Sequence, residues 1–211
     1  MANMVLVERD YVAMREIERW RFCLGRHIKE LAGFTVQRTC DRRLAILIEG
    51  GYIERKKVLY GIPGMYNLTH KGKMLIGVNK RQEKIRVERV SHDIGVLDTA
   101  IYFMKKEQLK LEDITTEKQM YSMSGFGQRK HFPDFVFEKE GLKICVEVEL
   151  TPKLPQTFEK NVGDNYLTYD EQYWVVPKSG AKIRQMLEKI CDKYPNIKTL
   201  ELEEVRGNDP D

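Results

Sequence analysis

Three acidic residues in the C-terminal half have the types and spacing to hold a metal ion. Asp134 opens an expected strand, and Glu147 and Glu149 lie at the end of the next expected strand, residues 143–150. Because side chains alternate along a strand, the two glutamates share one face, opposite the apolar residues. Asp134 can then converge with Glu147 and bind one Mg²⁺ through carboxylate oxygens. A metal held there would activate water and stabilise charge at a phosphate. The alternative is an ordinary exposed strand face, which often carries Glu.

A second group of residues, in the N-terminal half, is suited to binding nucleic acid. Thr35 is placed to cap a helix that runs to Glu49. The C-terminal half of this helix is apolar, whereas its start is basic and carries amides. The residues expected to contact DNA from this start are Gln37, Arg38, Arg42 and Arg43. A helix with a buried end and a basic start suits insertion of that start into the major groove.

A basic hairpin is expected directly after this helix. Residues 52–60 form a strand that carries Lys56 and Lys57, residues 61–64 form a turn, and residues 65–68 return as a second strand. Thr69 is expected to cap the helix that follows. Two strands joined by a basic tip make a wing, which can lie along the phosphate backbone or in the minor groove.

The remaining elements are expected to surround these two groups. Hydrophobic periodicity predicts helices at 8–20, 26–32, 93–106, 157–169 and 181–194, and strands at 114–121, 134–138, 143–150, 172–176 and 199–205. The later part reads helix, three strands, helix, strand, helix, strand. This order predicts an α/β (α+β) fold class with a mixed sheet.

The distribution of charge separates the two halves of the 211-residue chain. Residues 1–90 carry 19 Lys and Arg against 10 Asp and Glu, whereas residues 91–211 carry 17 against 22. A basic half beside an acidic half is typical of a nucleic-acid-binding module joined to another domain. We expect domains at 1–78 and 91–211, with the charged residues 79–90 as a linker or helix.

Cysteine spacing and hydropathy indicate the compartment. The four cysteines are far apart in the sequence and form no Cys-x-x-Cys pair, so we expect reduced thiols. Residues 1–9 lack the pattern of a secretory signal, and no apolar run approaches the roughly 18 residues needed to cross a bilayer. We therefore expect a cytoplasmic protein without membrane contacts.

The N-terminal half resembles the winged-helix superfamily. The residues that carry the resemblance are Arg42-Arg43-Leu44 through Leu47, Glu49-Gly50-Gly51-Tyr52-Ile53, Tyr66-Asn67-Leu68-Thr69 and Lys71-Gly72. The resemblance implies a winged helix-turn-helix that binds double-stranded DNA over residues 1–78. The alternative is a small helical domain that makes protein contacts.

The C-terminal half resembles the PD-(D/E)xK nuclease superfamily, in Pro133-Asp134 and in Glu147-Val148-Glu149. This implies a restriction-endonuclease-like domain, with Glu117 as an additional upstream acid and metal ligand. The superfamily pattern has a lysine where this chain has Glu149, which puts catalysis in doubt. Lys153 or Lys160 would supply the ammonium group instead. His131, three residues before Asp134, could point into the site, but we favour its interpretation as a surface or packing histidine.

The whole chain resembles the replication-relaxation family of plasmids, phages and conjugative elements. The stretches that carry the resemblance are His92-Asp93-Ile94, Thr116-Glu117, Pro133-Asp134 and Val146 through Lys153. The resemblance implies a role in replication, relaxation or mobilisation. One hypothesis is a Mg²⁺-dependent DNA nuclease. The alternative is a non-catalytic winged-helix regulator or replication accessory protein, whose second domain mediates homodimerisation or binds replication or mobilisation proteins. A third is a domain that handles branched DNA without cutting it.

Overall fold

The structure, a computed structural model, describes residues 5–79, 85–124 and 131–207. The chain divides into two compact units, Met1–Leu97 and Asp98–Asp211. The division falls inside helix α5, Val90–Glu107, and therefore lies later than the expected start of the second domain at residue 91. Within the described ranges, no helix has the length and apolar character needed to span a membrane.

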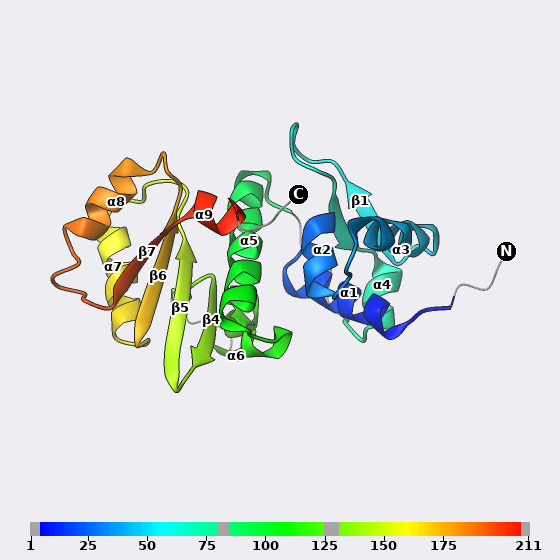
Figure 1. Cartoon of the computed structure of the whole chain (residues 1–211), viewed down its shortest axis with the longest axis horizontal. Coiled ribbons are helices and arrows are strands. Elements are labelled where there is room, and N and C mark those ends of the chain that lie inside the picture. The colour runs from blue at the N-terminus through cyan, green and yellow to red at the C-terminus, as the bar shows by residue number, and fades with distance from the viewer. Residues whose placement is uncertain (1–4, 80–84, 125–130, 208–211) are drawn as a thin grey trace. The chain divides into compact units, whose positions relative to one another are not determined.

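Unit 1 begins with three helices, which a hairpin and a further helix follow (Figure 1). The bounds are α1 Glu8–Arg19, α2 Gly25–Leu31, α3 Gln37–Glu49, β1 Ile53–Lys56, β2 Met65–Leu68 and α4 His70–Leu75, and a short 3-10 turn, η1, covers Val87–Arg89. The expected helices and hairpin are confirmed, although β1 ends at Lys56 and not at Tyr60. Cys23, between α1 and α2, forms an antiparallel bridge with Tyr66 of β2. The hairpin is thereby tied to the segment between the first two helices.

Helix α3 is anchored by one apolar face. Cys40, Leu44 and Leu47 are each at most 1% exposed, whereas Ile46 is 37% exposed. Position 36, a valine, precedes the first helical residue, and no side chain caps the helix there. The expectation that Thr35 caps α3 is therefore wrong, because the helix begins one residue too late for it.

Helix α4 begins at a side-chain cap and packs closely against the loop after α3. Thr69 Oγ1 accepts a hydrogen bond from the Gly72 N–H at 3.1 Å, so the expected Thr69 cap is confirmed. The same hydroxyl donates to the Gly51 carbonyl at 2.6 Å. A Cβ atom at Gly72 would lie 2.1 Å from the Tyr52 carbonyl oxygen, which no side chain could tolerate. Only glycine allows this approach of helix to backbone.

Unit 2 contains a five-stranded mixed sheet of order β3-β4-β5-β6-β7. The elements after α5 are η2 Leu111–Asp113, β3 Thr115–Thr116, α6 Glu117–Ser124, β4 Phe135–Lys139, β5 Leu142–Val148, α7 Pro155–Tyr166, β6 Glu171–Val176, α8 Ala181–Glu188, β7 Ile197–Glu201 and α9 Leu202–Gly207. Strands β3, β4 and β5 pair antiparallel, whereas β5, β6 and β7 pair parallel. The expected α/β class with a mixed sheet is confirmed.

Helices cover both faces of this sheet (Figure 1). On one face Trp174 of β6 packs with Phe158 of α7 and with residues of α8. On the other face Phe103 of α5 makes ring contacts with Phe137 of β4 and Tyr173 of β6. Because successive side chains of a strand point to opposite faces, Tyr173 packs against α5 on one face and Trp174 packs against α7 on the other. The central strands are therefore screened from solvent on both sides.

Two stretches expected to be strands contain helices. The expected strand at 114–121 is a two-residue strand, β3, followed by α6. Thr116 and Gln119 cap α6: the Gln119 side chain accepts from the Thr116 N–H at 2.9 Å, and the Gln119 N–H donates back to Thr116 Oγ1 at 3.4 Å. This reciprocal pair is a capping box, which favours a helix. The expected strand at 199–205 ends at Glu201, where α9 begins.

Replacing Leu47 with alanine tests the register of α3. Leu47→Ala removes a fully buried side chain and should lower the free energy of unfolding by about 2–5 kcal/mol. Ile46→Ala, at the exposed neighbouring position, is the matched control and should cost far less. Urea denaturation, followed by the fluorescence of Trp20 in unit 1 and Trp174 in unit 2, measures both. Equal costs for the two variants would mean that the helix is rotated from the position described.

Candidate functional site

The pairing of β4 with β5 brings Asp134 to Glu147. Phe135 lies opposite Val146, and the same antiparallel register places Asp134 opposite Glu147 one step further. Asp134 is 8% exposed and Glu147 is 4% exposed, so both residues are buried. The Val148 N–H donates to Asp134 Oδ2 at 2.8 Å, which fixes the aspartate against the neighbouring strand. The strand register therefore places the two acids opposite each other at the end of the β4–β5 pair.

Glu147 is held by two polar side chains. His131 Nε2 lies 2.5 Å from Glu147 Oε1, and the Asn165 amide of α7 donates to the same oxygen at 3.1 Å. The interpretation of His131 as a surface or packing residue is wrong, because it is part of the acidic site. Asn165 is 2% exposed, and the sequence did not lead us to expect it in the site. One feature of the sequence could have indicated its burial: Asn165 lies on the same helical face as the apolar Phe158 and Val162.

Glu149 carries its own ammonium partner. It follows the end of β5, is 5% exposed, and its N–H donates to the Val175 carbonyl at 3.0 Å. Lys153 Nζ lies 2.5 Å from Glu149 Oε2. Lys160, the other candidate for the ammonium group, pairs instead with Asp164 on α7 at 2.6 Å. The structure therefore brings Lys153, and not Lys160, to the acids.

The face of β5 that carries the acids is buried, so the alternative of an ordinary exposed strand face is wrong. Cys145 is fully buried, as are Glu147 and Glu149. Burial and the charge of Glu147 raise the pKa of the Cys145 thiol, so it stays protonated and unreactive. Burial, and then Cys145 and Glu147, raise the pKa of Tyr169 to about 12. The alternating pattern is correct, but helices cover both faces of the strand.

Glu117 contributes its backbone to this region. It is the first residue of α6, and its N–H donates to the Asp134 carbonyl oxygen at 2.9 Å. In the part of the chain that the structure describes, no three His, Cys, Asp or Glu side chains form a group that could hold a metal. The expected three-ligand set of Asp134, Glu147 and Glu117 is therefore not assembled.

The charges of the acidic site are compensated by its own cations. Burial raises the pKa of Glu149 despite the neighbouring Lys153, and the charges of Glu147 and Asp134 raise it further. Burial alone would lower the pKa of Lys153, but its contact with Glu149 and the charges of Glu147 and Asp134 together raise the pKa. His131 behaves in the same way: burial lowers its pKa, and the hydrogen bond and charge of Glu147 raise it by more. Both cations are stabilised in their charged forms.

The start of α3 presents two arginines to solvent in unit 1. Arg38 and Arg42 are exposed, and within residues 5–79 neither takes part in an ion pair. Gln37, the first helical residue, donates to Asp41 Oδ1 at 2.8 Å, so its amide is engaged within the helix.

Arg43 differs from its neighbours because it bonds inside the unit. Its Nε donates to Asp10 Oδ1 at 2.6 Å, and a second nitrogen contacts the other carboxylate oxygen. It also donates to the Val5 carbonyl at 2.8 Å. Asp10 is fully buried, and its carboxylate also accepts from the Val7 N–H at 2.8 Å. Arg43 thus has a structural role in joining α3 to α1, which the sequence did not indicate.

The cations of the hairpin differ in whether they have a partner within the protein. Lys57 is exposed, whereas Lys56 Nζ lies 2.5 Å from Glu54 Oε1. Arg55, which was not singled out in the sequence, lies over the Tyr66 ring at 5.7 Å from its centre. A Cβ atom at Gly64, just before β2, would meet the Arg55 side chain at 2.5 Å, so the glycine leaves room for the arginine.

The His131–Glu147 pair should be visible in the titration of His131. In the Glu147→Gln variant the carboxylate charge is lost while burial remains, so the pKa of His131 should fall below its ordinary 6.5. NMR titration of the imidazole in the parent and the variant measures this fall. An unchanged midpoint would show that Glu147 does not contact His131.

The same pair makes the stability of unit 2 depend on pH. The pKa of His131 is higher folded than unfolded, so its contribution is fully present below about pH 6.5 and is lost as pH rises through the raised value. His131→Gln should abolish this loss above pH 6.5, whereas His70→Gln, at an exposed position, should not. Thermal melting of the three proteins across this range makes the comparison. Parallel curves for the parent and His131→Gln would contradict the assignment.

Two regions therefore stand out by geometry: exposed cations on α3 and the hairpin of unit 1, and a charge-compensated acidic site in unit 2. Their assignment to a function depends on the residues themselves. Comparison with protein-family models, with curated proteins and with solved structures found no match for this chain.

Proposed function

We propose that the chain is a double-stranded DNA-binding protein whose unit 1 is a winged helix-turn-helix. The observation that carries the proposal is the division of α3, whose Leu44 and Leu47 are buried while Arg38 and Arg42 face solvent. Three helices, a bridge at Cys23 and a hairpin follow the order of a winged helix. In this arrangement the start of the third helix enters the major groove.

The available cations suit contacts with phosphate. Arg38 and Arg42 project from α3, and Lys57 projects from the hairpin that follows it. Neutralising phosphates releases counterions, so such contacts supply affinity that falls steeply with salt. Arg43 is excluded from this set because its guanidinium holds the buried Asp10. Its contribution is to fix the orientation of α3.

For unit 2 we propose a nuclease-like fold that serves a regulator or replication accessory protein of a mobile element. The order α5, β3, α6, β4, β5, α7, β6 resembles that of the nuclease superfamily, with α6 added between the first two strands. Each acid of the site already has a protein partner: Glu147 with His131, Glu149 with Lys153, and Asp134 with the Val148 N–H. Such compensation favours a domain that binds DNA, a second copy or a replication protein without cleaving DNA.

A metal-dependent nuclease is the second candidate, and the juxtaposition of Asp134 and Glu147 favours it. These two carboxylates would hold Mg²⁺, which would activate water and offset charge at the phosphate. Lys153 lies beside the acids and could place its ammonium near a phosphate. His131 would have to release Glu147 first, because His131 and Mg²⁺ would compete for the Glu147 carboxylate.

Charge-removing variants of the full chain test the DNA interface. Arg42→Gln and Lys57→Gln should each weaken binding to a mixed-sequence duplex, and each should reduce the slope of log K against log salt by about one unit. Lys110→Gln, at an exposed position of unit 2, is the matched control. Fluorescence anisotropy at several salt concentrations measures the slopes. If the control loses as much as the two variants, the interface does not lie on unit 1.

Calorimetric titration with Mg²⁺ distinguishes the two roles of unit 2. For a non-catalytic domain, we expect the same small heats from the parent and from Asp134→Asn, and no cleavage of supercoiled plasmid. A nuclease would bind Mg²⁺ and gain thermal stability through that binding, and Asp134→Asn would lose both. Binding by a nuclease should also weaken as the pH falls, because protonated His131 competes for Glu147. Cleavage by the parent but not by the variant would replace the first role with the second.

A further inference from the structure

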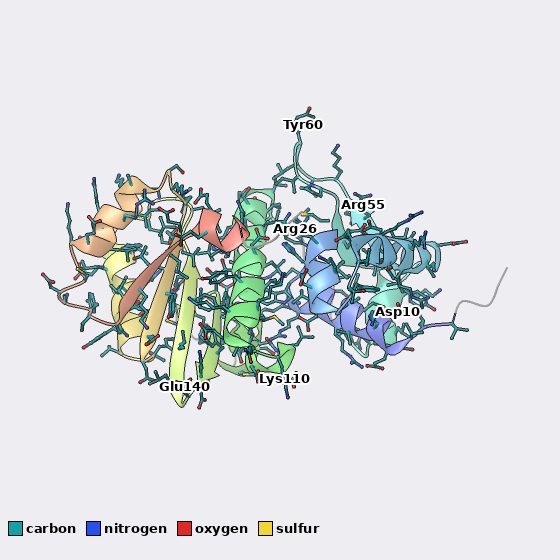
Figure 2. The ribbon with its side chains drawn as sticks, viewed as in Figure 1. Asp10, Arg26, Arg55, Tyr60, Lys110 and Glu140 are labelled. Atoms are coloured by element: carbon teal, nitrogen blue, oxygen red, sulfur yellow. The ribbon has the colours of Figure 1, made fainter. Side chains whose placement is uncertain are left out.

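The loop between β1 and β2 ends in a completely exposed aromatic side chain. Tyr60 is 99% exposed, the largest value among the exposed apolar side chains of the described residues. Figure 2 shows it at the tip of the loop, pointing away from the ribbon. Gly61, directly after it, has a φ of +77°, a left-handed conformation that lets the chain turn back at this point. The turn therefore leaves Tyr60 as the outermost residue of the hairpin.

The loop on either side of Tyr60 is anchored. Val58, Leu59 and Ile62 are partly buried and pack against a core that includes Phe22 and Met65. Apolar residues that pack in this way fix the loop without help from a ligand. Tyr60 is thus presented on a supported loop, and ordering it on binding would cost little entropy.

The surroundings of Tyr60 favour a polyanion. Residues 57–64 contain Lys57 and no Asp or Glu, and Lys56 precedes them. An isolated exposed apolar residue needs no special explanation. Tyr60 differs because its three apolar neighbours in the loop are packed inward while the aromatic ring alone is turned outward.

We propose that Tyr60 is a base-stacking residue that enters the minor groove of the duplex bound by α3 and wedges between two base pairs. This inference rests on the proposed function and adds to it a specific contact and a deformation of the DNA. Aromatic and aliphatic side chains that enter the minor groove part the base stack and kink the duplex. The wedge unwinds the duplex where it enters, so sites with flexible base steps are favoured.

The length of the loop permits this contact. Four residues lead from the end of β1 at Lys56 to Tyr60, and a chain of four residues reaches at most roughly 13 Å. The minor groove is about 6 Å wide and 7.5 Å deep. The length of the loop exceeds this depth, so Tyr60 can reach the base pairs from a strand that lies along the phosphates. Lys57 would contact the phosphates at the edge of the minor groove, while the ring of Tyr60 would enter the groove between the two phosphate backbones.

Two variants at position 60 separate stacking from other roles. Tyr60→Ala should lower the affinity for a mixed-sequence duplex roughly tenfold, whereas Tyr60→Phe, which keeps the ring, should stay close to the parent. The slope against salt should not change in either variant, because the phenol carries no charge. Met74→Ala, at a position of unit 1 that is 56% exposed, is the matched control and should bind like the parent. Thermal melting should be the same for all four proteins, since Tyr60 supports no core.

Unwinding gives a second, independent readout. A closed circular plasmid relaxed by a topoisomerase in the presence of the parent or of Tyr60→Phe should show a lowered linking number, and with Tyr60→Ala it should not. If the linking number is unchanged by the parent, and Tyr60→Ala weakens binding only to single-stranded oligo(dT), the ring stacks on unpaired bases and insertion into the duplex is wrong. If Tyr60→Ala binds duplex like the parent while Arg42→Gln is weakened, the inference fails and the proposed function stands. If the parent binds no duplex at low salt, both fail.

Discussion

Strand β5 lies at the centre of the sheet of unit 2, with a neighbour on each edge and helices over both faces, and this constraint determines the acidic site. A carboxylate on such a strand cannot be hydrated, and an unpaired buried charge is costly. Glu147 and Glu149 persist there because His131, Asn165 and Lys153 supply donors to them. The cations and the amide are therefore as much a part of the site as the acids.

Unit 1 differs from unit 2, because several of its cations are exposed to solvent. Asp10 is fully buried and takes up the guanidinium of Arg43, which ties α3 to the first helix. One arginine of the helix is committed to the fold, and this leaves Arg38 and Arg42 facing outward from a helix whose orientation is fixed. Removing one partner of such a buried pair leaves the other charge uncompensated. This ion pair and the buried apolar face of α3 together fix the direction in which the exposed cations point.

Periodicity and turn residues predicted most helices and strands of this chain, because the spacing of buried residues is a local property. The exception at Ile114–Tyr121 had a local signal, since Thr116 and Gln119 have the spacing of a capping box. The convergence of Asp134 with Glu147 could also be predicted, from strand alternation and pairing. The partners of these acids could not, because Asn165 and His131 reach Glu147 only through the tertiary packing of α7 and the segment before β4. The commitment of Arg43 to Asp10, 33 positions away, was hidden for the same reason.

Gly72 has a consequence for how this chain can diverge during evolution. Its backbone lies against the Tyr52 carbonyl so closely that even a methyl group would have no space. Met74, two positions later, is 56% exposed and meets no such restriction. Descendants of this protein can therefore exchange residue 74 freely, whereas a glycine three positions after the Thr69 cap must be inherited unchanged. A descendant with any other residue at position 72 would have to move helix α4 away from the chain at Tyr52.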